Sequence, residues 1–272
     1  MISTIIFSKN RACQLDLLLR SIEKNFGNIS KDIWVLHYSD TPDFRLAYQK
    51  VINNFPGVAW WTQLSDSFQK DTMTLLGRAK KYVCFFVDDN IVYRKPEIHG
   101  DVIEKMMDEF EDAGCFSLRL GLNTTIQDPY SKTPIAKMPY FVDFRLPQNI
   151  NVLSWDWTSI PMSNFSYPFS VDGHIYNTQL VQDSLDYEFD TPNAFEGRFV
   201  HSRIPSAMFC LPQSSVVNNP INLVGSSQNK AGVWHGHSLE ELNQAYLDGR
   251  RIQLEVTEKI LGCHQEIPIS YV

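Results

Sequence analysis

The chain has 272 residues, of which 43% are hydrophobic, enough to bury one sizeable core or one core with a smaller lobe. Lys and Arg number 24 and Asp and Glu number 31, which gives a formal net charge of -7. This acidic balance excludes general attraction to the phosphates of nucleic acid or to an anionic membrane surface, so any phosphate recognition must be local.

The cysteine pattern and the first residues bear on the cellular compartment. Five cysteines, odd in number and far apart, form no CxxC pair, so neither a disulfide framework nor a zinc site is expected. They are Cys13, Cys84, Cys115, Cys210 and Cys263. The apolar run 1–7 meets Lys9 and Arg11 with no basic stretch before it, so it is read as a strand and not as a signal peptide. No apolar stretch reaches the length of a membrane span, and the sequence predicts a cytoplasmic protein without an integral membrane segment.

Strands and helices alternate through the N-terminal half. Apolar, β-branched runs predict strands, and apolar residues at helical spacing predict helices between them. The strands are expected over residues 3–8, 33–38, 58–62, 82–87 and 115–120, and the helices over 12–25, 43–54, 71–80 and 96–113. Asp71 is read as the cap of the third helix. This alternation predicts an α/β fold with a mainly parallel sheet flanked by helices on both faces.

The character of the chain changes after residue 120. Residues 121–167 are rich in Pro, Asn, Thr, Ser and aromatics, which predicts a loop-rich region with a few antiparallel strands. A further strand is expected over 169–172 and a helix over 176–185. Ser238 and Glu241 form a capping-box pattern, which predicts a last helix that stops at Gly249.

Three oxygen-bearing side chains follow the most apolar strand. Asp88, Asp89 and Asn90 come directly after residues 82–87, and ligands of open α/β sheets bind beyond the carboxyl ends of the strands. Adjacent carboxylates repel each other, and Mg²⁺ or Mn²⁺ would relieve the repulsion and leave positions open for phosphate oxygens. The alternative is a polar turn after a strand.

Three segments in order resemble a known class of enzyme. They are Ile5 to Arg11 with Gln14-Leu15, the Phe-Phe-Val-Asp-Asp-Asn block that ends at Asn90, and Val171-Asp172-Gly173-His174. Together they look like bacterial and viral GT-A glycosyltransferases, over most of the first 200 residues, with the acidic cluster as the DxD motif. The third position of that motif is Asn90 here, where the motif has Asp. The resemblance implies one GT-A domain, with a nucleotide-sugar-binding half at 1–120 and an acceptor-side half with the C-terminal helix at 121–272.

The resemblance also assigns residues to the donor. It implies contacts from Phe7, Ser8, Lys9 and Arg11 after the first strand, from Tyr38, Ser39 and Asp40 after the second, and from Asp71, Asp88 and Asp89. Some of these residues have structural alternatives. Arg11 could be a solvated cation at a helix start, Asp40 a turn residue and Asp71 only a helix cap.

Metal ligands and a general base are implied in the same way. Asp89 and Asn90 would hold Mn²⁺ or Mg²⁺, with a late histidine from His235 or His237. Asp172 or Glu196 would take the proton of the acceptor hydroxyl if the configuration inverts. The alternatives are loop histidines, a turn for Asp172 and a surface acid for Glu196. Trp155 and Trp157 could stack on a sugar or pack in the core.

The function that follows from the resemblance is metal-dependent transfer of a sugar, as in hexosyltransferases. The donor would be a nucleotide diphosphate sugar, with UDP as the expected nucleotide, and the acceptor a hydroxyl of a glycan or another molecule. One alternative is a non-catalytic carbohydrate-binding protein on the same fold. The other is a nucleotidyltransferase, which should carry a Gly-rich phosphate loop after the first strand. Residues 8–12 contain no glycine, which disfavours it.

Overall fold

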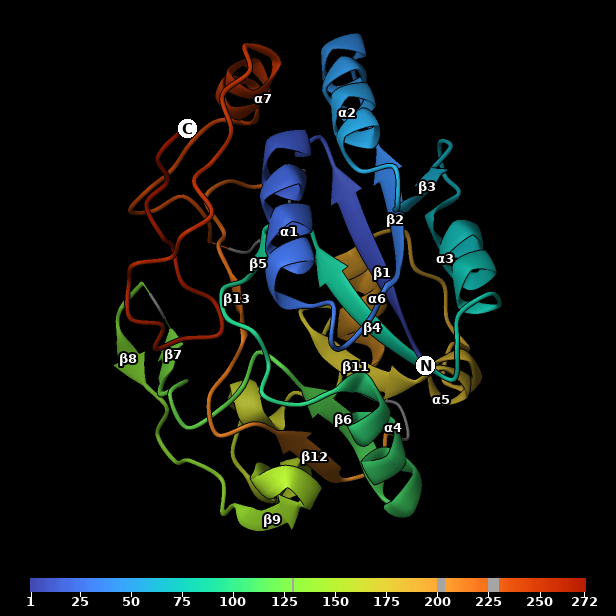
Figure 1. Cartoon of the computed structure of the whole chain (residues 1–272), viewed down its shortest axis with the longest axis vertical. Coiled ribbons are helices and arrows are strands. Elements are labelled where there is room, and N and C mark those ends of the chain that lie inside the picture. The colour runs from blue at the N-terminus through green and yellow to red at the C-terminus, as the bar shows by residue number, and fades with distance from the viewer. Residues whose placement is uncertain (129, 200–203, 225–229) are drawn as a thin grey trace.

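The computed structural model describes residues 1–128, 130–199, 204–224 and 230–272. Within them, one nine-stranded sheet runs through the molecule and takes strands from both halves of the chain (Figure 1). In spatial order its strands are β3 (Ala59–Thr62), β2 (Asp32–Tyr38), β1 (Ile2–Lys9), β4 (Tyr82–Val87), β11 (His174–Asn177), β6 (Ala113–Ser117), β12 (Ala207–Cys210), β10 (Ile150–Asp156) and β9 (Val142–Leu146).

Two small antiparallel sheets and the helices complete the described structure. The small sheets pair β5 (Asn90–Val92) with β13 (Val216–Asn218) and β7 (Ile126–Asp128) with β8 (Thr133–Pro134). The α-helices are α1 (Ala12–Asn25), α2 (Pro42–Asn54), α3 (Phe68–Leu76), α4 (Gly100–Glu109), α5 (Thr178–Asp183), α6 (Pro192–Phe199) and α7 (Leu239–Leu247).

Strand directions confirm the predicted α/β class. Strands β3, β2, β1 and β4 are parallel, and β12 is parallel to β6. Strand β11 runs antiparallel to both β4 and β6, and β10 and β9 add an antiparallel edge. The loop-rich region therefore contributes antiparallel strands to one end of a sheet whose other end is parallel.

Helices cover both faces of the sheet because its central strands are apolar on both sides. Neighbouring side chains of a strand point to opposite faces. Ile6 and Phe86 accordingly belong to one apolar core, together with residues of α1, α2, α4 and α7, whereas Ile5 and Phe85 belong to the other core, with residues of α3, α5 and α6. Figure 1 shows α1 in front of the sheet and α6 behind it.

Several predicted elements have different bounds in the structure. Helix α3 begins at Phe68 after Ser67, so Asp71 lies inside its first turn and is not its cap. Residues 169–172, expected to be a strand, are irregular; strand β11 begins at His174, after the turn at Gly173. The helix expected from residue 176 is α5, which starts at Thr178 because the Asn177 side chain accepts hydrogen bonds from the first turn.

The fourth helix is also shorter than predicted. Residues 96–113 were expected to be helical, but α4 covers Gly100–Glu109. The Nδ2 atom of Asn28 donates hydrogen bonds to the carbonyl oxygens of Pro96 and Ile98, which fixes the preceding segment outside the helix. No helix in the four described ranges has both the length and the apolar character to cross a membrane.

The turn before β11 depends on a glycine. Gly173 has φ +75°, and an added Cβ would lie 3.1 Å from Cγ1 of Val216. Gly173→Ala should lower the free energy of unfolding by about 1–2 kcal/mol, because an L-residue is strained in this backbone region. Urea denaturation measures the loss. Gly57→Ala is the matched control, since a Cβ there meets open space at an ordinary φ; equal losses in both variants would contradict the argument.

Candidate active site at the carboxyl ends of β1 and β4

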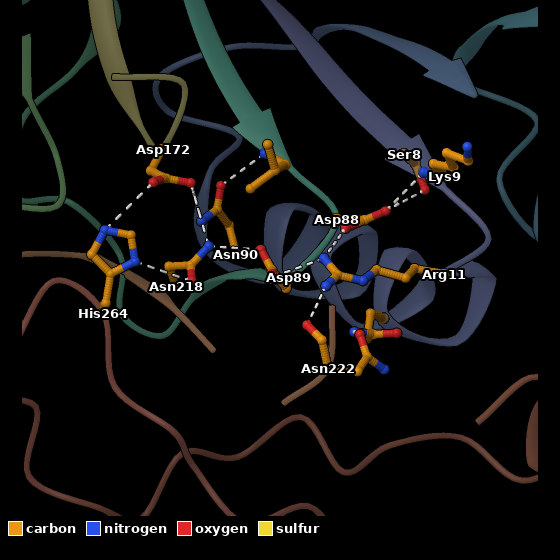
Figure 2. Close-up of polar contacts among 12 residues, drawn as sticks. Ser8, Lys9, Arg11, Asp88, Asp89, Asn90, Asp172, Asn218, Asn222 and His264 are labelled. Carbon is orange, nitrogen blue, oxygen red and sulfur yellow. Dashed lines mark hydrogen bonds and ion pairs between the residues drawn. The ribbon is translucent and has the colours of Figure 1, made fainter. Parts of the chain in front are cut away.

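Parallel pairing of β1 and β4 brings two predicted segments together. Phe7 pairs with Val87 in register, and the amide of Asp88 extends the ladder with a hydrogen bond of 3.1 Å to the carbonyl of Phe7. The residues that follow both strands therefore lie side by side (Figure 2). Both strands are buried, so their ends present polar groups at the margin of the core.

Asp88 is held by the loop that follows β1. Its Oδ2 accepts hydrogen bonds from the Ser8 hydroxyl at 2.9 Å and from the Lys9 amide at 3.0 Å. Its Oδ1 lies 3.0 Å from Nη1 of Arg11. The carboxylate is almost fully buried, and burial raises its pKa, while the Arg11 charge acts in the opposite direction.

Asp89 shares the same guanidinium. Its Oδ2 lies 2.8 Å from Nη1 of Arg11, and its Oδ1 accepts a hydrogen bond of 2.6 Å from Nδ2 of Asn218. Burial raises the pKa of Asp89 to about 7; Arg11 opposes this shift, and the charges of Asp88 and Asp172 add to it. One nitrogen of Arg11 thus contacts both carboxylates of the pair.

Asn90 links this pair to Asp172. Strand β5 pairs with β13 so that Asn90 faces Asn218. The Asn90 side-chain oxygen accepts a hydrogen bond from the Val87 amide at 2.9 Å, and its Nδ2 donates to Oδ1 of Asp172 at 3.0 Å. Nδ2 of Asn218 lies 3.4 Å from the same Asp172 oxygen. The Asn90 oxygen that was expected to bind a metal is therefore engaged with the backbone in this structure.

A second buried arginine neutralises Asp172. Nη1 of Arg119 donates to Oδ2 of Asp172 and to the Ser170 hydroxyl, both at 2.6 Å. Its Nη2 contacts Sγ of Cys263 at 3.2 Å and Nε2 of His264 at 3.1 Å. Burial and the Arg119 charge together lower the pKa of His264 to about 4, against the opposing charge of Asp172. The imidazole is therefore neutral around pH 7.

Glu196 belongs to the same electrostatic group. It lies on α6 and is half-buried. Burial, reinforced by the negative charge of Asp172 and opposed by Arg119, raises the pKa of Glu196 to about 7. The two carboxylates that the sequence offered as alternative bases therefore influence each other, and Asp172 makes an ion pair with Arg119 at 2.6 Å.

The predicted donor residues after β1 and β2 form a second group. Nζ of Lys9 lies 3.4 Å from Oδ1 of Asp40 and 5.2 Å from the centre of the Tyr38 ring. Asn10, in a left-handed conformation, exchanges two hydrogen bonds with Asp40, at 2.7 and 2.9 Å. Ser39, which lies between Tyr38 and Asp40 in the sequence, is half-buried. Lys9, Tyr38 and Asp40 thus come together at the carboxyl ends of β1 and β2, here called the rim.

Two other predicted donor residues have clear structural surroundings. The Phe7 side chain is buried in an aromatic cluster, with ring centres 5.1 Å from Phe68 and 6.2 Å from Phe195. Asp71 is buried in α3, where its carboxylate accepts a hydrogen bond from Ser67. Phe7 could touch a donor only through its backbone.

The two late histidines lie in a segment that one carboxylate organises. Glu266 accepts hydrogen bonds from the amides of Val233, Trp234 and His235 at 2.6, 2.7 and 2.8 Å. His235 is exposed and His237 half-buried. Among the described residues, no three His, Cys, Asp or Glu side chains lie close enough together to hold a metal ion. The structure therefore does not group either histidine with Asp88 and Asp89.

Two cavities adjoin these residues. A small one, of about 10 Å³, is lined by Gln14, Asp88 and Asp89 among others. An open one, of about 430 Å³, is lined by residues that include Asn222, Gly232 and His237. The Asn222 carbonyl accepts a hydrogen bond from Nη2 of Arg11. Arg11 therefore contacts both the acidic pair and a residue that lines the larger cavity.

Sequence reasoning missed four residues that complete the site: Arg119, Asn218, Asn222 and His264. One of them carried a signal. Arg119 interrupts the apolar run 115–120, and a charge inside a buried segment needs a partner. The others follow no pattern along the chain. Trp155, which was considered as a sugar platform, is buried, and its Nε1 donates to the Phe165 carbonyl at 2.8 Å.

Comparisons with known proteins concern the fold. No protein-family model matches the chain, and a search of curated protein sequences finds no significant match. Among solved structures, residues 1–349 of TarS from S. aureus, in complex with UDP-GlcNAc, superpose with a TM-score of 0.50 at 16% identity, covering 85% of this chain and 61% of that one. This chain spans less than two thirds of that TarS fragment.

Two other structures are similar at lower scores. A mannosyltransferase from Pyrobaculum calidifontis, in complex with GDP-Man and Mn²⁺, gives a TM-score of 0.42 at 10% identity, covering 78% of this chain and 54% of that one. A 4-diphosphocytidyl-2C-methyl-D-erythritol synthase from Anaerococcus prevotii gives 0.38 at 9%, covering 91% and 96%. Only the TarS score is high enough to bear on the fold. The chain has a GT-A fold.

Arg119 should be essential for the stability of this arrangement. Arg119→Met should lower the free energy of unfolding by about 3–5 kcal/mol, because it leaves the buried carboxylate of Asp172 without its cation. Chemical denaturation measures the loss. Arg78, exposed and stacked on the Trp61 ring, is the control; Arg78→Met should change stability by only about 0.5 kcal/mol or less. Similar losses in the two variants would show that Asp172 does not need Arg119.

Proposed function

We propose that this chain is a glycosyltransferase that moves a sugar from a nucleoside diphosphate donor to a hydroxyl acceptor. The observation that carries the proposal is the buried Asp88–Asp89 pair at the carboxyl end of β4, on a GT-A fold. Two adjacent buried carboxylates destabilise a fold unless a cation neutralises them. Their position beyond a central parallel strand is where open α/β sheets bind ligands.

The pair fits a divalent metal, Mn²⁺ or Mg²⁺, as part of this proposal. Nη1 of Arg11 contacts one oxygen of each carboxylate, at 3.0 and 2.8 Å, so a single cation can be shared by Asp88 and Asp89. Mg²⁺ needs only one or two protein carboxylates when substrate phosphates and water supply the remaining oxygens. The proposal therefore does not require His235 or His237. A bound metal would supply charge neutralisation for the leaving diphosphate.

The rim formed by Lys9, Tyr38, Ser39 and Asp40 is proposed to bind the nucleoside. Lys9 offers a cation beside the Tyr38 ring, and the half-exposed carboxylate of Asp40 can accept hydrogen bonds from ribose or base. UDP is the proposed nucleotide. The UDP-GlcNAc complex of TarS, whose fold is similar, supports this choice.

Glu196 is the proposed general base, and Asp172 the residue that positions the groups around it. Both Asp172 oxygens already accept hydrogen bonds, one from Arg119 and the other from Asn90. A carboxylate stabilised in this way is a poor proton acceptor. Burial raises the pKa of Glu196 to about 7, which suits a base that must be deprotonated near neutral pH and still accept a proton.

Metal-dependent nucleotide binding tests the proposal directly. UDP with Mn²⁺ should stabilise the protein by about 2.7 kcal/mol at a concentration 100-fold above Kd, and UDP without metal should stabilise it far less. Asp89→Asn should remove the metal-dependent part, because the pair loses half its charge. Differential scanning fluorimetry measures both effects.

The exposed Asp186 provides the control for the Asp89 variant, since Asp186→Asn should bind like the wild type. Stabilisation by a glycan alone, with no response to UDP and Mn²⁺, would favour a carbohydrate-binding protein over a transferase. Unchanged metal-dependent UDP binding in Asp89→Asn would refute the assignment of the metal to this pair.

The role of Glu196 predicts a pH profile. The rate of UDP release from UDP-GlcNAc should rise with pH and level off above about pH 7, as Glu196 loses its proton. Glu196→Gln should lower kcat by about 10²–10⁴-fold and abolish this limb, with UDP binding retained. A wild-type rate in Glu196→Gln would exclude Glu196 as the base.

Glu196→Gln should lower the activity but raise the stability of the protein, and the gain in stability serves as an internal control. Because the pKa of Glu196 is raised in the folded protein, the folded state favours protonated Glu196. Ionisation of Glu196 therefore lowers the free energy of unfolding as pH rises from the pKa of Glu196 in the unfolded chain to about 7. Glu196→Gln should therefore melt a few degrees above the wild type at pH 8 and at the same temperature at pH 4. Together, lost turnover and increased stability separate a missing base from a misfolded protein.

A further inference from the structure

Arg11 occupies the position of a cation beside the acidic pair. Its side chain is 10% exposed, and Nη1 contacts both Asp88 and Asp89. Figure 2 shows the guanidinium between the two carboxylates and the Asn222 carbonyl. The pair is thus already compensated by one positive charge from the chain itself.

Apart from the acidic pair and the Asn222 carbonyl, the surroundings of Arg11 do not favour this position of its side chain. Arg11 is the N-cap residue of α1 without a capping hydrogen bond from its side chain, and a positive charge at a helix N-terminus is unfavourable. Its buried Nε has no hydrogen-bond partner among the described residues, and an unsatisfied buried donor costs about 1–3 kcal/mol. The two carboxylates are therefore the main reason that the side chain stays there.

Arg11 and a divalent ion cannot both stay at the pair. A dication shared by the two carboxylates would lie within a few ångströms of the guanidinium, and like charges at that distance repel by several kcal/mol in a protein interior. The other groups that hydrogen-bond to Arg11, the Tyr48 hydroxyl and the Asn222 carbonyl, are neutral and could not offset this repulsion. Hydrogen bonds from Ser8 and the Lys9 amide keep Asp88 in place without Arg11.

We infer that Arg11 is an internal counter-ion that competes with divalent metal for the Asp88–Asp89 pair. Metal binding then requires the guanidinium to leave, and the incoming diphosphate, being anionic, stabilises the displaced arginine. The chain would therefore bind metal weakly alone and tightly together with a nucleoside diphosphate. This inference rests on the proposed metal-dependent function and adds the residue that couples metal binding to donor binding.

Binding of Mn²⁺ in the absence of nucleotide tests this competition. The electron paramagnetic resonance signal of free Mn²⁺ gives the affinity directly, without any turnover. Arg11→Gln removes the charge and should tighten Mn²⁺ binding about tenfold or more relative to the wild type. Adding Asp89→Asn to this variant should abolish the gain, because the pair then lacks one carboxylate. Equal Mn²⁺ affinity in the wild type and Arg11→Gln overturns the inference.

Arg20 is the matched control on the same helix. Its Nε donates to the buried carboxylate of Asp16 at 2.8 Å, far along α1 from the acidic pair. Arg20→Gln should leave the Mn²⁺ affinity within about twofold of the wild type, since it changes no charge near the pair. A gain as large as that of Arg11→Gln would show a general charge effect and would also overturn the inference.

Arg11→Gln leaves two buried carboxylates without a cation and could unfold the protein. Circular dichroism melting with and without Mn²⁺ covers this case. Mn²⁺ should restore folding or raise the melting temperature of Arg11→Gln more than that of the wild type, and failure to do so counts against the competition. UDP binding by the wild type is measured in parallel: without it the proposed transferase function fails, whereas the Mn²⁺ titrations, made without nucleotide, still decide the role of Arg11.

Discussion

The need to neutralise buried carboxylates organises this molecule. Asp88, Asp89 and Asp172 are all buried, and Asn218 lies within hydrogen-bond distance of the last two, at 2.6 and 3.4 Å. Each end of this group has its own arginine: Arg11 for the first pair and Arg119 for Asp172. Because a lone buried charge costs several kcal/mol, each end needs a cation beside its carboxylates. The proposed metal-dependent transfer would explain why the fold keeps charge at this place.

The two arginines differ in their partners and surroundings, and this difference bears on their proposed roles. Arg119 has four partners, at 2.6 to 3.2 Å, and all belong to the buried interior or its margin. Arg11 has three side-chain partners, Asp88, Asp89 and Asn222, and Asn222 also lines the open cavity. In the proposed exchange, Arg119 continues to compensate the charge at Asp172, whereas Arg11 gives way to the metal at Asp88 and Asp89. The proposed exchange of one cation for another therefore takes place at Asp88 and Asp89 and not at Asp172.

The sequence predicted the parts of this arrangement that depend on local pattern. Apolar runs predicted the central strands, and the resemblance placed Ser8, Arg11, Asp88 and Asp89, which follow two of these strands, together at the donor site. The position of Asp71 was wrong because Ser67 starts α3 one turn earlier. The strand near Asp172 was misplaced because the turn at Gly173, with φ +75°, separates it from the apolar residues before it. Tertiary contacts decide such boundaries, and composition does not encode them.

Three of the four partners that sequence reasoning missed, Asn218, Asn222 and His264, come from the last third of the chain, and their origin shows how the site is completed. Strand β13 pairs with β5, which brings Asn218 against Asn90. The C-terminal segment then continues the pairing: the Asn218 amide donates to the Cys263 carbonyl at 2.9 Å, and the Gln265 amide donates to the Asn218 carbonyl at 2.9 Å. Residues near the C-terminus have few regular elements of their own, but these bonds fix His264 beside Asp172. The acidic corner supplied by the first 90 residues is therefore shaped by residues more than 120 positions later, which no local pattern could reveal.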